Sequence, residues 1–145
     1  MSIWHADNPL DLVAMTEWGT ATMPGFLGIE FVGIGDDWLK ARMPVNARTH
    51  QPFGRLHGGA SIAFAETVAS TAGALTIDRS THVTVGQEIN GNHIRAVRDG
   101  YVYATAKAES IGRSSQVWTI RVESEEGKLV CLSRITLAVI ALDRA

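Results

Sequence analysis

Near the middle of the chain, residues 58–77 carry a single charged side chain, that of Glu66. The other positions are mostly small or apolar, and the run is too long for one strand. Because the run is also rich in alanine, we predict a buried helix over residues 60–75. A membrane-spanning helix is not expected, since the run also contains the hydroxyl side chains of Ser61, Thr67, Ser70, Thr71 and Thr76.

Glu66 is the most informative residue of this helix. A carboxylate buried without a partner is costly, so Glu66 has to gain partners or become protonated. Helical spacing places Gly59, Ala63, Ser70 and Gly73 on the same face, and all four are small, so a ligand or another backbone can approach there. A structural Glu66 that caps a strand or pairs with an arginine is an equally good interpretation of this spacing.

The sequence His57-Gly58-Gly59 directly precedes the predicted helix. Backbone N–H groups at a helix start point outward, and the helix dipole favours negative charge there. Glycines allow a substrate carbonyl to come close, so the segment has what an oxyanion hole needs. The alternative is that the two glycines only shape a tight turn.

An apolar run broken by two glycines indicates a strand at 26–34, and alternating apolar and polar residues indicate strands at 38–45, 101–109 and 116–122. Further strands are expected at 82–89 and 129–141. A short helix is expected near the N-terminus, with Asn8 as its cap, Pro9 at its first position and Gly19 at its end. No helical connection separates the strands after residue 77, which favours an antiparallel sheet and the α+β class. We therefore expect one domain over residues 1–145 with an N-terminal helical segment at 1–23, and association between copies.

Composition excludes several classes of protein. The 145 residues are 46% hydrophobic and 19% charged, which excludes a disordered chain. A net charge of −2 offers no positive field for nucleic acid. The one cysteine, Cys131, fits a reducing compartment, and the N-terminus has neither the basic start nor the apolar core of a secretory signal, so we expect a cytoplasmic protein.

Two common catalytic arrangements are not supported by the residue spacing. His50, His57 and His93 have no metal-ligand spacing, so no metal is expected. No G-x-S-x-G segment is present to supply a nucleophilic serine. Cys131 lies in an alternating strand and is interpreted as a core residue.

Three segments in order resemble the hotdog-fold acyl-CoA thioesterases, and especially the clade that hydrolyses aromatic acyl-CoA thioesters. They are THQPFGRLHGGAS at 49–61 with AET at 65–67, GQEINGNHIR at 86–95 and GRSSQVW at 112–118. That clade includes 1,4-dihydroxy-2-naphthoyl-CoA hydrolases and the proofreading thioesterases of enterobactin synthesis. The resemblance covers about residues 24–140 and implies a helix wrapped by an antiparallel sheet, in dimers that assemble into tetramers.

The resemblance also implies roles for individual residues at a site shared between two subunits. Gly58 N–H polarises the thioester carbonyl, and Glu66 of the other subunit attacks it or activates a water molecule. Gln51 and Ser70 position the carbonyl or that water. His57 holds the arrangement in register or assists the departing thiolate.

Further residues match substrate-binding positions of the family. Arg95, Arg113 and Ser114 match positions near the CoA phosphates, which gives meaning to the ten arginines among the 13 basic residues. The positions that match the acyl and thioester region are Phe53, Gly54, Gly59, Gly86 and His93. The implied protein needs no cofactor, since CoA is part of its substrate, and it engages neither membrane nor nucleic acid.

Three alternatives remain open at this stage. The chain is also interpretable as a thioesterase that acts on acyl groups held by a carrier protein. A binding module that senses acyl-CoA without hydrolysing it has no need of a carboxylate beside the thioester, so Glu66 argues against that interpretation. A hydratase or dehydratase on the same fold is disfavoured, because no acid–base pair with suitable spacing is present.

Overall fold

The computed structural model describes residues 1–144. Two short helices and two strands precede a long helix, and four strands follow it, as the sequence patterns predict for the strands and the long helix. The elements are α1 (Leu12–Trp18), α2 (Met23–Leu27), β1 (Glu30–Ile34), β2 (Trp38–Pro44), α3 (Gly58–Leu75), β3 (His82–His93), β4 (Tyr101–Ile111), β5 (Ser115–Ser124), β6 (Leu129–Ala141) and η1 (Leu142–Arg144).

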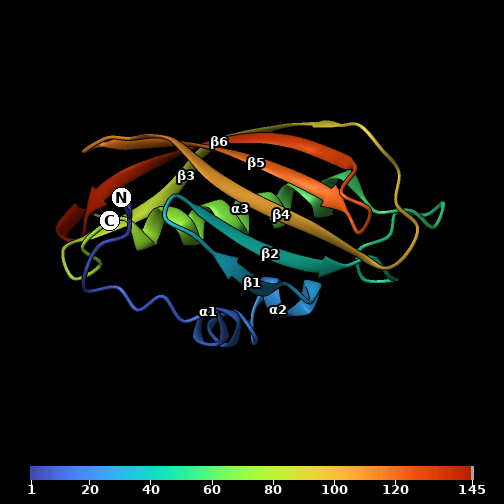
Figure 1. Cartoon of the computed structure of the whole chain (residues 1–145), viewed down its shortest axis with the longest axis horizontal. Helices are drawn as coiled ribbons and strands as arrows, with labels where there is room; N and C mark the ends of the chain where they lie inside the picture. Colours follow the sequence, from blue (N-terminus) through green and yellow to red (C-terminus); the bar gives the residue numbers. More distant parts are fainter. Residues whose placement is uncertain (145) are drawn as a thin grey trace.

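The six strands form one sheet in the order β1-β2-β4-β5-β6-β3, and every neighbouring pair is antiparallel. The sheet curves around α3, while α1 and α2 lie outside it beside β1 (Figure 1). This is the helix wrapped by an antiparallel sheet that defines the hotdog fold, so the predicted architecture is confirmed. Strands β1 and β3 are the two edges of the sheet.

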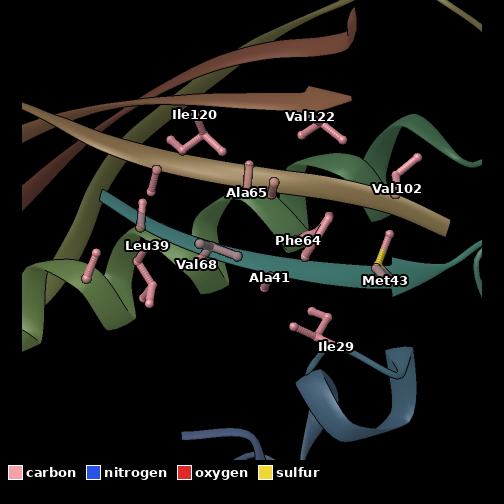
Figure 2. Close-up of a cluster of buried hydrophobic side chains, with 14 of the residues drawn as sticks. Ile29, Leu39, Ala41, Met43, Phe64, Ala65, Val68, Val102, Ile120 and Val122 are labelled. Atoms are coloured by element: carbon pink, nitrogen blue, oxygen red, sulfur yellow. The ribbon is translucent and has the colours of Figure 1, made fainter. Parts of the chain in front are cut away.

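The core lies between one face of α3 and the concave face of the sheet (Figure 2). Phe64 and Val68 on α3 are fully buried, and they meet the inward side chains of β2, β4 and β5. On β4 the buried positions include Ala104 and Ala106, whose short side chains leave room for the helix. The strict alternation of buried and less buried residues along β2 and the first part of β4 matches the period from which the strands were predicted.

The N-terminal segment differs from the prediction. Helix α1 is capped by Asp11, whose Oδ1 accepts the two N–H groups of the first turn at 3.0 and 3.1 Å, and Pro9 lies before the helix. Asn8 instead uses its side-chain amide as a donor to the carbonyl oxygen of Leu75, at 2.9 Å, at the end of α3. Asp is as good a cap as Asn, so local preference alone does not decide between the two residues. Gly19 ends the helix as predicted.

The predicted strand over 26–34 is also partly wrong. Its first residues belong to α2, and only Glu30–Ile34 forms β1. Pro24 lies in the first turn of α2, where a fixed φ favours a helix, and Gly28 ends it in the left-handed conformation with φ 76°. These two local signals outweigh the apolar character of the segment between them.

Candidate active site

The first turn of α3 leaves one backbone donor free. His57 is the N-cap, and its Nδ1 accepts the N–H of Gly59 at 2.8 Å. The carbonyl oxygen of His57 accepts the N–H groups of Ala60 and Ser61, at 3.0 and 3.2 Å. The N–H of Gly58 has no hydrogen-bond partner among the described residues. A single free donor therefore stands at the positive end of an 18-residue helix.

A tight turn before the helix positions Gln51. The N–H of Gln51 donates to the carbonyl of Arg55 at 2.7 Å, and Gly54 supports the turn with φ 76°. The side-chain Oε1 of Gln51 accepts the N–H of Phe53, which leaves its NH₂ group as a donor for another molecule. Phe53 itself is 82% exposed at the tip of the turn, so within one chain it lines neither of the two cavities described below.

A cavity of about 360 Å³, here called the helix-start cavity, brings several predicted residues together. The ring of His93 lies against Gly58, where a Cβ atom would be only 2.8 Å from His93 Nε2. The cavity is lined by Gln51, Arg55, Leu56, Gly58, Ser61, His93, Ile94, Arg95, Ala96 and Val130. Two donors for a carbonyl oxygen, Gly58 N–H and the Gln51 amide, therefore adjoin two arginines.

Glu66 lies in the middle of α3, away from this cavity. It is half-buried rather than buried as expected, because it lies against β3, which is an edge strand of the sheet. Its carboxylate has neither a hydrogen bond nor an ion pair within residues 1–144. The carboxylate rests on Gly86 of β3, where any Cβ atom would collide with Oε1. Gly86 thus serves the close approach of Glu66 to the strand.

A second cavity of about 600 Å³, here called the α1–α3 cavity, begins at Ser70, one turn along the helix from Glu66. It lies between α1, the second half of α3 and the start of β3. Its lining residues are Pro9, Asp11, Ala14, Met15, Trp18, Ser70, Thr71, Ala74, Leu75, Ile77, Arg79, His82, Val83, Thr84 and Leu142. Ser70 is therefore close to Glu66, as the helical spacing predicts.

The structure does not bring all of the predicted residues together in one chain. Gly58 and Glu66 are eight residues apart on α3, which is about 12 Å along the helix axis. One thioester carbonyl does not bridge that distance. The donors at the helix start and the carboxylate thus form two separate parts of a site.

The three predicted phosphate-binding residues are divided in the same way. The N–H of Arg95 donates to the carbonyl of Val130, whereas the carbonyl of Ser114 accepts the N–H of Val139. These two contacts are nine residues apart on β6, or about 30 Å. Arg95 is therefore remote from Arg113 and Ser114, which lie in the exposed turn between β4 and β5.

Sequence reasoning missed many of the residues that line the cavities, among them Arg55, Trp18 and Arg79. Arg55 lines the helix-start cavity together with Arg95. Its position inside the segment 49–61, which carries the resemblance, could have identified it as a site residue. Trp18 and Arg79 meet at one end of the α1–α3 cavity, with the guanidinium 5.5 Å from the ring centroid. No sequence signal links these two, since only the fold brings them together.

Two other features bear on the chemistry. In the described part of the chain, His, Cys, Asp and Glu side chains do not gather in groups of three that would hold a metal ion. Cys131 is buried in the core as predicted, and burial raises the pKa of its thiol.

Over residues 1–144, none of the helices has both the length and the apolar character required to cross a membrane.

Comparisons with known proteins match the chain over almost its whole length. Residues 53–131 match the family described as the thioesterase superfamily. The chain is 47% identical to the 1,4-dihydroxy-2-naphthoyl-CoA hydrolase of Escherichia coli, over 95% of this chain and 99% of that protein. It is also 47% identical to the proofreading thioesterase EntH of Cronobacter turicensis, over 94% and 98% respectively. The crystal structure of a mutant thioesterase from Pseudomonas aeruginosa superimposes with a TM-score of 0.94 at 42% identity, covering 97% of this chain and 100% of that one.

Proposed function

The chain belongs to the thioesterase superfamily and is a thioester hydrolase, and we propose that it hydrolyses acyl-CoA thioesters with aromatic acyl groups to the free acid and CoA. The observation that carries this proposal is the free N–H of Gly58 at the start of α3, next to the Gln51 amide. The relatives named above, which act on a naphthoyl-CoA or are proofreading thioesterases, support the choice of substrate class.

In the proposed reaction, the helix start stabilises the charge that develops on the thioester oxygen. The Gly58 N–H donates to this oxyanion, and the dipole of α3 adds to its effect. One such donor contributes ~3 kcal/mol to the transition state. The Gln51 NH₂ is the second donor, because its own oxygen is already held by the N–H of Phe53.

Glu66 supplies the nucleophilic part of the reaction. In one route its carboxylate attacks the carbonyl carbon and expels the CoA thiolate, and water then hydrolyses the resulting anhydride to the free acid and restores Glu66. In the other route Glu66 removes a proton from an attacking water, which Ser70 orients, and the C–S bond breaks to release the thiolate. The CoA thiolate is a good leaving group, so a strong general acid is not required. His57 acts as a positioning residue, because its Nδ1 is occupied by the N–H of Gly59 and holds the first turn of the helix.

Two chains are needed to bring these groups onto one carbonyl. We place Gly58, His57 and Gln51 of one subunit opposite Glu66 of a second subunit, since the separation of about 12 Å within one helix is too long. The edge strand β3 supports such pairing, because it is 12 residues long and mostly exposed. A dimer with two shared sites follows, and the proposal extends to a tetramer of two such dimers in the cytoplasm.

The same pairing of subunits explains why the predicted phosphate-binding residues lie at opposite ends of one chain. Arg95 and Arg55 lie at the start of α3, and Arg113 and Ser114 lie at the opposite end of the sheet. In an antiparallel dimer, opposite ends of two subunits meet, so these residues together receive the CoA phosphates. Arginine suits this role because its planar fork binds phosphate through two hydrogen bonds.

The experiment measures, with a thiol dye, the rate at which free CoA is released from a panel of thioesters. The panel is benzoyl-, hydroxybenzoyl-, hydroxynaphthoyl-, hexanoyl- and palmitoyl-CoA. Cys131 does not interfere, because it is buried and its pKa is raised. Glu66→Ala is compared with Glu109→Ala, which removes an exposed carboxylate from β4.

Fast hydrolysis of the aromatic esters, lost only in Glu66→Ala, is the expected result. CoA binding without hydrolysis of any ester would instead identify a binding module. Hydrolysis only of acyl groups on a carrier protein would contradict the choice of CoA thioesters.

A further inference from the structure

The α1–α3 cavity extends well beyond the residues used in the proposed reaction. Ser70 lies one turn from Glu66, Ala74 lies one turn further, and Arg79 follows the end of the helix. Ala74 is about 12 Å from Glu66 along the helix axis. An acyl group whose carbonyl lies beside Glu66 therefore enters at Ser70 and extends toward Arg79.

The walls of this cavity suit a large apolar acyl group. They are formed mainly by Pro9, Ala14, Met15, Ala74, Leu75, Ile77, Val83 and Leu142. A volume of about 600 Å³ is within the range of about 300–1,000 Å³ of pockets that hold drug-sized ligands. The cavity therefore has room for a bicyclic acyl group as well as for a single ring.

At the end remote from Glu66 lies Arg79, whose guanidinium makes no ion pair within residues 1–144. It lies over the ring of Trp18, 5.5 Å from the ring centroid, in a cation–π contact. This contact leaves N–H donors of the guanidinium available to a ligand.

Two carboxylates, one next to Arg79 in the chain and one in the lining of the same cavity, already accept hydrogen bonds from the backbone. Asp78 Oδ1 accepts the N–H and the hydroxyl of Ser80, at 2.9 and 2.6 Å, and these bonds lower the pKa of Asp78. Asp11 Oδ1 accepts the first N–H groups of α1. Neither carboxylate forms an ion pair with Arg79, so its guanidinium is available to a carboxylate that comes from a ligand.

We propose that Arg79 and Trp18 select aromatic acyl groups that carry a carboxylate at the end opposite the thioester. The ring system packs between the apolar walls, and the carboxylate accepts two hydrogen bonds from the guanidinium held against Trp18. This inference rests on the proposed function and names a narrower substrate class for the same site.

The test compares the hydrolysis of 6-carboxy-2-naphthoyl-CoA with that of 2-naphthoyl-CoA. Wild-type protein is expected to show a kcat/KM about ten-fold higher for the carboxylated ester, as a charge-assisted hydrogen bond allows. Arg79→Gln is expected to remove this preference, with a much smaller loss for 2-naphthoyl-CoA than for the carboxylated ester. Arg79→Lys retains the charge without the fork and keeps part of the preference. Arg98→Gln, another exposed arginine, is the matched control and changes neither ester.

Each outcome bears on a separate claim. Equal hydrolysis of the two esters by wild-type protein overturns the inference and leaves the proposed function intact, as does an equal loss for both esters in Arg79→Gln. Failure to hydrolyse these two esters overturns this inference, and failure to hydrolyse the benzoyl and hydroxynaphthoyl esters as well overturns the proposed function. Because Arg79 is exposed, its replacement is not expected to disturb folding.

Discussion

At the C-terminal end of α3, side chains from distant segments donate hydrogen bonds to the carbonyl groups, whereas at the N-terminal end the N–H of Gly58 has no partner within residues 1–144. Asn8 donates to the carbonyl oxygens of Leu75 and Ile77, at 2.9 and 2.8 Å. Gln116 donates to Thr76 at 2.8 Å and accepts from the indole of Trp118 at 2.9 Å. The C-terminal end of α3, here called the closed end, is therefore held in place by the segments around it. At the N-terminal end, here called the open end, the free N–H of Gly58 adjoins the helix-start cavity.

This difference between the two ends of α3 suggests that one end contributes to stability and the other to activity. A buried polar group without a partner is expensive, so the fully buried Gln116 and Trp118 have to satisfy each other. A partly exposed N–H is served by water, so a free donor at the helix start costs little when no substrate is bound. Changes at the open end should therefore affect kcat, and changes at the closed end should affect the free energy of unfolding.

The largest effect is expected from Gly58→Pro, which removes the free N–H. Proline is favoured at the first position of a helix, and His57 before it has ψ 131°, which is compatible with a following proline. Loss of this oxyanion donor should lower kcat by about 10²–10³ without a change in Tm. Gly58→Ala is the control, since it adds a Cβ atom beside the movable ring of His93 but keeps the N–H. Equal activity of the two variants would show that the donor is not used.

The next effect is expected from Gly86→Ala, in which the new Cβ atom displaces the carboxylate of Glu66. A misplacement of about 1 Å can cost about 10²-fold in rate, so kcat should fall by that order. Gly91→Ala on the same strand provides the comparison, because its Cβ atom meets a methyl group of Ile62 instead. A similar loss of kcat in both variants would point to distortion of β3 rather than to Glu66.

At the closed end, Gln116→Leu removes the partner of the Trp118 indole and of the Thr76 hydroxyl. The buried indole N–H of Trp118 is then left without a bond, while the Thr76 hydroxyl keeps its bond to the carbonyl of Gly73. The free energy of unfolding should fall by about 1–3 kcal/mol, measured by urea denaturation. The kcat should stay within about two-fold of wild type, since the change lies outside the site. A large loss of kcat with unchanged stability would contradict the division between the two ends.

The smallest effect is expected from Asn8→Ala, which removes hydrogen bonds to the carbonyls of Leu75 and Ile77. Because Asn8 is only half-buried, water replaces part of the loss, and the free energy of unfolding should fall by about 0.5–1.5 kcal/mol. Asp7→Ala, next to it and exposed, is the control. Equal stability of the two variants would remove Asn8 from the account of the closed end.

Much of the fold was predictable because its signals are local. The run around Glu66 has only one good interpretation as a long helix, and the alternation along β4 and β6 identifies strands directly. The role of Asn8 was not predictable, because its partner Leu75 is 67 residues away and only the tertiary structure joins them. Glu66 is less buried than expected, since the sequence does not say which face of a helix a sheet will cover.

The residues of the candidate site also fall into those that the sequence could locate and those that it could not. Gln51 and Gly58 lie within one short segment, so its motif located them together. Trp18 and Arg79 come from segments 61 residues apart, and nothing in either segment marks a binding residue. Residues joined by chain proximity can thus be found from the sequence, and those joined by packing require the structure.

The central claim is that the free donor of one chain and the carboxylate of another form one active site. Co-expression of Gly58→Pro and Glu66→Gln chains with different tags gives a mixed dimer that can be purified by both tags. In that dimer, one of the two sites has its donor and its carboxylate intact, so the activity per dimer should be about half that of wild type. If both groups of a site come from the same chain, every site in the mixed dimer is defective, and an inactive mixed dimer would contradict the account.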